Sequence, residues 1–130
     1  MSGSIRILIV APSDRISDSL RVLLRARRNL VIVGQATDSA TGLRMIAERP
    51  PDLVLLSTGL PEAEVLTMLQ ELLRNWPLVR CCVLAQNAAQ ERQACQMGAY
   101  AVLQTGFAAE ELYQVVEKIH DNRYLQAGKG

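Results

Sequence analysis

Five short apolar runs constrain the fold of this chain more than any other feature. Each is too short to form a helix, and together they cover residues 5–10, 30–33, 53–56, 82–84 and 100–103. Most are rich in valine, isoleucine and leucine without alternating polar residues. This pattern is typical of strands covered on both faces, as in a parallel sheet flanked by helices. We expect each run to be a buried strand.

Longer stretches between these runs place apolar residues at helical spacing. The predicted helices cover residues 14–27, 37–48, 62–76, 88–97 and 108–120. Ser13 is the expected N-cap of the first helix. In the last helix Tyr113 should remain more exposed than a stripe that faces the sheet, which consists of Leu112, Val115, Val116 and Ile119.

The strict alternation of strand and helix predicts an α/β fold with a doubly wound parallel sheet and helices on both faces. In a five-stranded sheet of order 2-1-3-4-5 the winding reverses at strands 1 and 3, so a site is expected at their carboxyl ends. The residues there are Ala11, Pro12, Ser57 and Thr58. We expect one domain over residues 1–125, with 126–130 as a tail or the start of a linker.

The charge balance and the cysteines exclude several classes of function. Fourteen basic and thirteen acidic residues give a formal net charge of +1, which creates no whole-chain attraction for nucleic acid or an anionic membrane. Three cysteines without framework spacing are typical of a reduced, cytoplasmic protein, and adjacent Cys81 and Cys82 would point to opposite sides of a strand. We expect no membrane span, metal or cofactor, because long apolar runs, ligand clusters and glycine-rich phosphate loops are missing.

The segment 51–61 carries a resemblance to a known family. It reads Pro-Asp-Leu-Val-Leu-Leu-Ser-Thr-Gly-Leu-Pro and resembles the third strand of the receiver domains of two-component response regulators, in which a buried strand runs into an aspartate followed four residues later by proline. The first strand at 5–10 is also similar, and further matches are Val33-Gly34, Ala36, Asp38, Gly98-Ala99 and Glu110-Glu111-Leu112. The resemblance covers nearly the whole chain and implies a flavodoxin-like fold.

The same resemblance implies a phosphorylation site whose chemical groups are missing here. Receivers use an acidic pair to hold magnesium, an aspartate to accept the phosphoryl group, and a hydroxyl and a lysine to bind it. The corresponding positions in this chain are Ala11 and Pro12, Ser57, Ala85, and Thr105. The aromatic residue that reports phosphorylation corresponds to Val102. The sequence therefore predicts an atypical receiver, a pseudo-receiver that is not an enzyme.

Other chemistry at these positions is not favoured by the sequence. Ser57 has no histidine or acidic residue obviously placed to activate it, so a polar strand end is the simpler interpretation. Asp14 follows the first strand too late, and Asp52 precedes the third strand, so neither restores an acidic pocket. Arginines on the first predicted helix could form a nucleic-acid face, but a solvated helix surface fits the neutral total charge better.

Two hypotheses of different classes follow. The first is a signalling module that acts through protein contacts, independently of aspartyl phosphorylation, with an effector domain, a histidine kinase or a second copy as partner. The resemblance places its interface on the fourth helix, fifth strand and fifth helix, where Tyr100 and Tyr113 are the candidates. This domain alone should not bind nucleic acid. The alternative is a small-molecule-binding or catalytic domain that reuses the cleft around Ala11, Ser57 and Ala85, together with Thr105.

Overall fold

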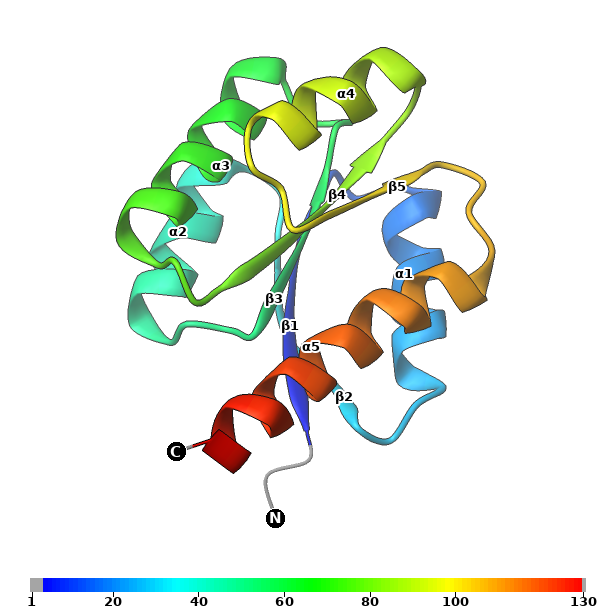
Figure 1. Cartoon of the computed structure of the whole chain (residues 1–130). Coiled ribbons are helices and arrows are strands. Elements are labelled where there is room, and N and C mark those ends of the chain that lie inside the picture. The colour runs from blue at the N-terminus through cyan, green and yellow to red at the C-terminus, as the bar shows by residue number, and fades with distance from the viewer. Residues whose placement is uncertain (1–3, 130) are drawn as a thin grey trace.

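A computed structural model describes residues 4–129, with side chains through Ile119. It is a parallel five-stranded sheet in the order β2-β1-β3-β4-β5, as predicted. Helices α1 and α5 cover one face, and α2, α3 and α4 cover the other (Figure 1). None of the described helices combines the length and the apolar character that a membrane crossing requires.

The elements alternate along the chain as the sequence predicts. The strands are β1 (Ile5–Val10), β2 (Leu30–Ala36), β3 (Leu53–Ser57), β4 (Arg80–Ala85) and β5 (Ala101–Gln104). The helices are α1 (Arg15–Arg25), α2 (Ser39–Glu48), α3 (Glu62–Asn75), α4 (Ala88–Gln96) and α5 (Ala109–Lys129).

Strand β2 extends three residues beyond its predicted end. Its pairing with β1 shifts between Ile7 and Leu8, which leaves Val33 as an extra residue in a bulge, and the strand then continues to Ala36. Gly34 follows the bulge and lies against α2: a Cβ atom there would lie 2.2 Å from the Cε of Met45, so that flexible side chain would have to move.

The helix boundaries differ from the predictions most clearly at the starts of α1 and α2 and at the end of α5. Asp14, not Ser13, caps α1: its Oδ1 accepts from the Ser17 amide at 3.1 Å, and Ser17 Oγ accepts from the Asp14 amide at 3.2 Å. Helix α2 begins at Ser39 because Asp38 Oδ1 accepts from the Thr41 amide at 2.7 Å, which lowers the pKa of the Asp38 carboxyl. Helix α5 runs on to Lys129, well past the predicted end at residue 120.

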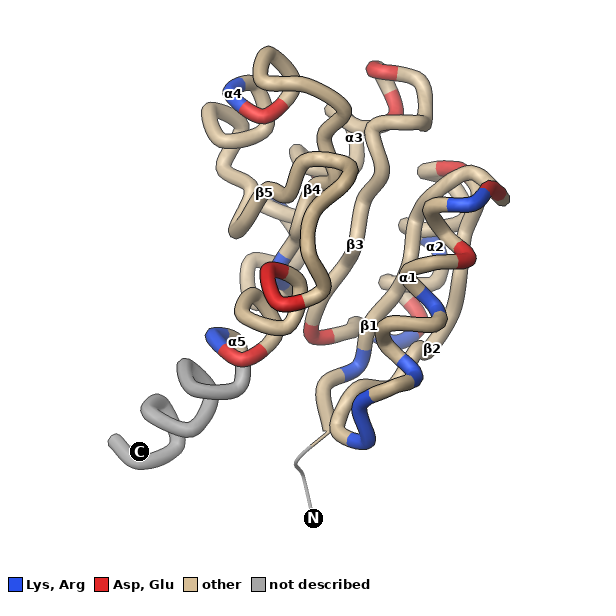
Figure 2. Tube along the Cα trace, turned by 90° about the vertical axis from the view of Figure 1, so that its right-hand side faces the viewer, with Lys and Arg blue, Asp and Glu red and all other residues tan. Residues whose placement is uncertain are grey.

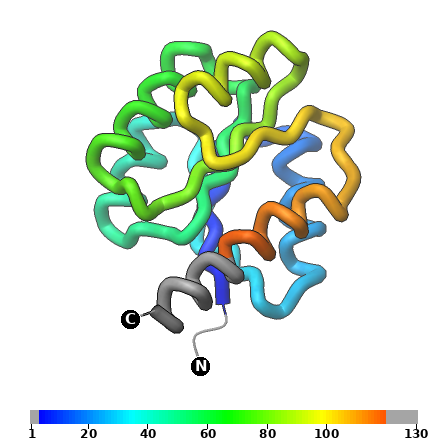
Figure 3. Tube along the Cα trace, in the orientation of Figure 1, coloured from blue at the N-terminus to red at the C-terminus, as the bar shows by residue number. Residues whose placement is uncertain are grey.

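The sheet separates two apolar cores. Cys82 lies in the core under α1 and α5 and Cys81 in the core under α2, α3 and α4, so the prediction that they point to opposite sides is confirmed. Burial raises the pKa of the Cys82 thiol to about 12. The predicted stripe of α5 is also confirmed as buried, while Tyr113 is only partly buried. Figure 3 shows how α1 and α5, distant in the sequence, come to lie side by side.

Charge is distributed unevenly over the fold. Residues 1–50 carry eight of the fourteen basic residues and four of the thirteen acidic ones. The region that contains α1, β2 and α2 is therefore basic, although the net charge of the whole chain is only +1. Figure 2 shows most of the lysine and arginine positions on this side of the molecule.

Candidate functional site

The carboxyl ends of β1 and β3 bring Ala11, Pro12 and Ser57 together, as predicted from the strand order. Ala11 is fully buried and Ser57 is 3% exposed. A Cβ atom on Gly59 would lie 3.2 Å from Ser57 Oγ and 3.3 Å from Pro12 Cγ. The proline ring and the β3–α3 loop therefore lie close together beside the end of β3, and a side chain at Gly59 would need a small shift of its neighbours.

The hydroxyl groups at this edge are engaged by the backbone. Ser57 Oγ accepts from the amide of Gly59 at 3.0 Å. Thr58 donates twice to the carbonyl oxygen of Leu84, from its amide at 3.1 Å and from Oγ1 at 2.9 Å, which fastens the loop to β4. A backbone amide cannot serve as a base, so the described contacts of Ser57 are those of a turn residue rather than an activated nucleophile.

Ala85 and Thr105 end the next two strands. The Thr105 amide donates to the Ala85 carbonyl at 2.8 Å, so the two residues are adjacent, but Ala85 is fully buried and Thr105 is exposed. Gly106 then takes a φ of +90°, a conformation that favours glycine. Val102 pairs with Val83 of β4 and packs, half-buried, against the core under α3 and α4.

The nearby acidic residues have structural contacts of their own. Asp14 caps α1. Asp52 lies at the amino end of β3, where it accepts from the Arg6 amide at 2.8 Å and approaches the Arg6 guanidinium at 3.7 Å. Within the described part of the chain, no group of three or more histidine, cysteine, aspartate or glutamate side chains could hold a metal ion. The described acidic groups therefore form no obvious metal site.

The two candidate interface tyrosines lie in different surroundings. The hydroxyl of Tyr113 donates to the carbonyl of Leu23 on α1 at 2.9 Å, and the Arg27 guanidinium lies 4.0 Å from its ring centre. Tyr113 thus joins α5 to α1. Tyr100, just before β5, has the guanidinium of Arg80 5.3 Å from its ring centre. Their role in an interface stays a prediction.

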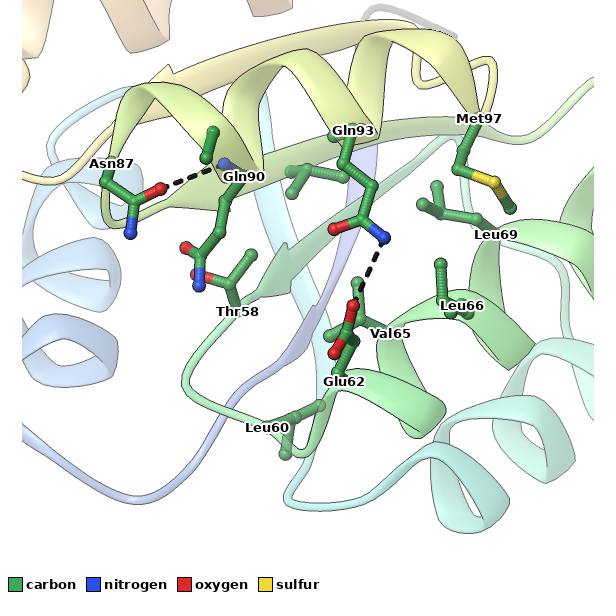
Figure 4. A pocket seen from close by; sticks show the side chains of 13 residues that line it. Thr58, Leu60, Glu62, Val65, Leu66, Leu69, Asn87, Gln90, Gln93 and Met97 are labelled. Carbon is green, nitrogen blue, oxygen red and sulfur yellow. Dashed lines mark hydrogen bonds between the residues drawn. The ribbon is translucent and has the colours of Figure 1, made fainter.

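One feature that sequence reasoning missed is a groove between α3 and α4, with a volume of about 340 Å³ (Figure 4). The sequence predicts helices over residues 62–76 and 88–97 but indicates no groove between them. The available signal was the concentration of side-chain amides at Gln86, Asn87, Gln90 and Gln93. Three of these line the groove.

Comparisons with known proteins agree with this architecture. Residues 7–117 match the response regulator receiver domain family. The chain is 27% identical over 121 residues to the transcriptional regulatory protein YhcZ of Bacillus subtilis, covering 92% of this chain and 56% of YhcZ. It is 26% identical over 124 residues to the response regulator GacA of Pseudomonas aeruginosa, covering 93% of this chain and 58% of GacA.

A shorter match of 28% identity over 106 residues is to a protein-glutamate methylesterase/protein-glutamine glutaminase of Hahella chejuensis; it covers 79% of this chain and 29% of that protein. The chain thus spans little more than half, or less, of these three relatives.

Solved structures show the same fold. A CheY-like response regulator receiver domain protein from Methanospirillum hungatei superposes with a TM-score of 0.80 at 22% identity, covering 95% of this chain and 98% of that one. A LuxR-family response regulator from Aurantimonas gives a TM-score of 0.81 at 21% identity, with 92% and 86% coverage. Because the family match spans most of the chain, this protein belongs to the response regulator receiver domains, which are in general non-enzymatic modules of two-component signalling.

Proposed function

We propose that this receiver domain signals through protein contacts and does so without aspartyl phosphorylation. The observation that carries the proposal is the packing of Pro12 and Gly59 against Ser57 at the end of β3. In the receiver resemblance this is the place of the magnesium ion and the phosphoryl group, and here Pro12, Ser57 and Gly59 lie close together without a carboxylate among them.

The chemistry of the side chains supports the proposal. Magnesium prefers hard oxygen ligands, and Ala11 and Pro12 offer no side-chain oxygen. A carboxylate attacks an activated phosphoryl group without prior deprotonation, whereas Ser57 is an alcohol bonded to a backbone amide. Thr105 cannot supply the positive charge of a lysine, and Ala85 has no hydroxyl. Each step of phosphorylation would therefore lack its group.

The same substitutions bear on switching. In the resemblance a hydroxyl after strand 4 and an aromatic side chain on strand 5 move together when phosphate binds. Ala85 and Val102 stand at these positions, and Val102 is packed in the core under α3 and α4. A bound phosphate would therefore have no pair of switching side chains to move. We infer that the protein contacts of this domain depend on the surface of its unphosphorylated fold or on a signal other than phosphorylation.

The partners that fit this role are an effector domain, a histidine kinase or a second copy of the chain. The names of YhcZ and GacA describe a transcriptional regulatory protein and a response regulator, and both relatives extend well beyond the matched region. By analogy, an effector region attached to this domain is part of the proposal. The proposed contact surface is the face of α4, β5 and α5, with Tyr100 at its edge.

The alternative, a ligand or reaction in the vacated cleft, has no observation in its favour. Ala11 and Ala85 are fully buried and Ser57 is 3% exposed, so three of the four residues of that cleft do not reach solvent.

The test is to expose the chain to phosphoryl donors. Acetyl phosphate and beryllofluoride with millimolar magnesium should leave its mass and its backbone NMR spectrum unchanged, while a phosphorylatable receiver domain treated in parallel responds. A stable phosphoryl adduct, or magnesium-dependent shifts clustered around residues 11, 57 and 85, would overturn the proposal.

A further inference from the structure

The groove between α3 and α4 has the size of a small-molecule site. Its volume of about 340 Å³ falls within the range of roughly 300–1,000 Å³ typical of ligand pockets. Val83 of β4 lies among its lining residues, with the two helices on either side. The groove lies beside the closed edge described above, and Thr58 is the residue at their border.

The groove has an apolar half and a polar half. Leu66, Leu69 and Met97 gather at one end in Figure 4, whereas Thr58, Asn87 and Gln90 gather at the other. A ligand that fills it must therefore combine an apolar body with hydrogen-bonding groups at one edge.

The orientation of two amides is fixed by the fold. Asn87 Oδ1 accepts from the backbone N–H of Gln90 at 2.9 Å, and Gln90 Oε1 accepts from the backbone N–H of Gln86 at 2.8 Å. Each side-chain amide has one oxygen and one NH₂ group, so using the oxygens leaves the NH₂ groups as donors. Neither NH₂ group has a partner among the described residues. The polar half therefore offers donors to a ligand.

A third amide bridges the groove. Gln93 Nε2 donates to Glu62 Oε1 at 3.2 Å, and both side chains are exposed (Figure 4). An exposed bond of this length is inexpensive to break. Opening it would free an amide with both a donor and an acceptor, and a carboxylate able to accept an N–H. Glu62 is the only charged side chain among the residues that line the groove.

From these groups we propose that the groove binds an uncharged heterocycle of the nucleobase class, as a free base or a nucleoside. A base has flat faces that suit Leu69 and Met97, ring acceptors for the two NH₂ groups, and an exocyclic amine for Glu62. Amide and carboxylate side chains pair with such base edges in other proteins. A phosphate would find no lysine or arginine in the lining and would add negative charge near Glu62. The site would give the domain an input that does not depend on phosphorylation.

The test is a titration of the full ¹⁵N-labelled chain with adenosine, guanosine, cytidine and uridine, followed by NMR, with adenosine monophosphate as the charged comparison. We expect at least one of the three nucleosides with an exocyclic amine, adenosine, guanosine or cytidine, to give saturable shifts confined to residues 58–69 and 87–97. The monophosphate should bind at least about tenfold more weakly than its nucleoside. If the nucleoside that binds is not adenosine, its own monophosphate replaces adenosine monophosphate in this comparison.

Matched variants decide whether the groove is responsible. Gln93→Leu removes a side-chain amide, and Glu62→Gln replaces a charged acceptor with a neutral one and puts an NH₂ donor in place of one oxygen. Each should weaken binding by roughly tenfold. Gln96→Leu on α4 and Glu71→Gln on α3 make the same chemical changes at residues that do not line the groove, and they should bind as the unaltered chain does. The spectra of the variants also show whether each is folded.

Three outcomes would overturn the inference. They are the absence of saturable shifts with every nucleoside, equal binding by the groove and control variants, and a monophosphate that binds as tightly as its nucleoside. A failure here leaves the phosphorylation-independent role untouched, since that role is tested by phosphoryl donors.

Discussion

The carboxyl edge of the sheet and the groove between α3 and α4 are neighbours that use their polar side chains in opposite ways. At the edge, Ser57 and Thr58 bond to the backbone, and Asp14 and Asp38 cap helices. In the groove, the amides of Asn87 and Gln90 keep NH₂ groups without partners among the described residues. Polar groups that are hydrogen-bonded within the fold stabilise it and have little remaining capacity to bond a ligand. Polar groups without a protein partner at a solvent-open groove lower stability little, because water can bond them, and they can bond a ligand.

The largest expected difference between the two regions is in packing. Leu55→Ala should lower the free energy of unfolding by about 2–5 kcal/mol, because this β3 side chain is fully buried and its loss leaves a cavity. Leu66→Ala, at a half-buried position that lines the groove, should cost about 1 kcal/mol or less. Urea unfolding of both variants measures the difference. Equal losses would mean that the groove is as tightly packed as the sheet.

A carboxylate at the closed edge should be the next largest perturbation. Ser57→Asp should destabilise by about 1–3 kcal/mol, because the new charge is placed where the serine is only 3% exposed. It should still fail to accept phosphate, since the metal ligands and the lysine remain absent and such groups act as a unit. Denaturation and intact mass after acetyl phosphate treatment check both points. Phosphorylation of this variant would show that the edge is open.

Hydrogen bonds in the two regions should differ by less. Thr58→Val removes the bond from Oγ1 to the Leu84 carbonyl and should cost about 0.5–1.5 kcal/mol. Gln93→Leu removes the exposed bond to Glu62 and should change stability by no more than about 0.5 kcal/mol. Thermal or urea unfolding can compare them. If Gln93→Leu proved the costlier change, the bridge across the groove would be a structural bond.

The smallest effect is electrostatic and depends on pH. Asp38 caps α2, and its hydrogen bonds with Thr41 lower its pKa from the ordinary value of 3.8. A lowered folded-state pKa contributes stability that is fully present above pH 3.8 and is lost as the pH falls from there through the lower pKa of the folded state. Asp38→Asn keeps a capping oxygen but carries no charge. The free energy of unfolding of the unaltered chain should therefore exceed that of the variant most near neutral pH, and the difference should shrink below pH 3.8. Urea unfolding at a series of pH values checks this, and a pH-independent difference would contradict it.

The sequence was informative where a local pattern decides the structure. Continuous apolar runs identified the strands, and the alternation of strand and helix indicated a doubly wound sheet. The order that places Ser57 beside Ala11 came from the five-stranded form of that fold, which the receiver resemblance implies. The N-cap of α1 was wrong because Ser13 was judged alone, although the three-residue spacing of Asp14 and Ser17 is that of a capping box. The end of β2 was predicted too early because residues 34–36 lack the apolar pattern of a strand, although they pair with Leu8 to Val10 of β1.

The groove between α3 and α4 could not be predicted from such local patterns, because it also depends on residues that are distant in the sequence. Its existence depends on how far α4 stands from α3, and helix separation is set by side chains of both helices and of β4 together. The direction of the amide groups depends on backbone bonds made by Asn87 and Gln90 after α4 has formed. Composition could indicate an amide-rich segment, but not that its donors would remain available.

The contact between α1 and α5 has a consequence for synthesis on the ribosome. Tyr113 and Leu23, which join the two helices, are 90 residues apart in the chain. The core under α1 and α5 includes Leu112, Val115, Val116 and Ile119, so it cannot be completed until residue 119 has emerged. Until then the apolar face of α1 has no α5 to pack against. Bringing α1 and α5 together closes a long loop, which is slow compared with forming local structure. Nascent chains should therefore resist proteolysis over this face only once nearly the whole sequence has been translated.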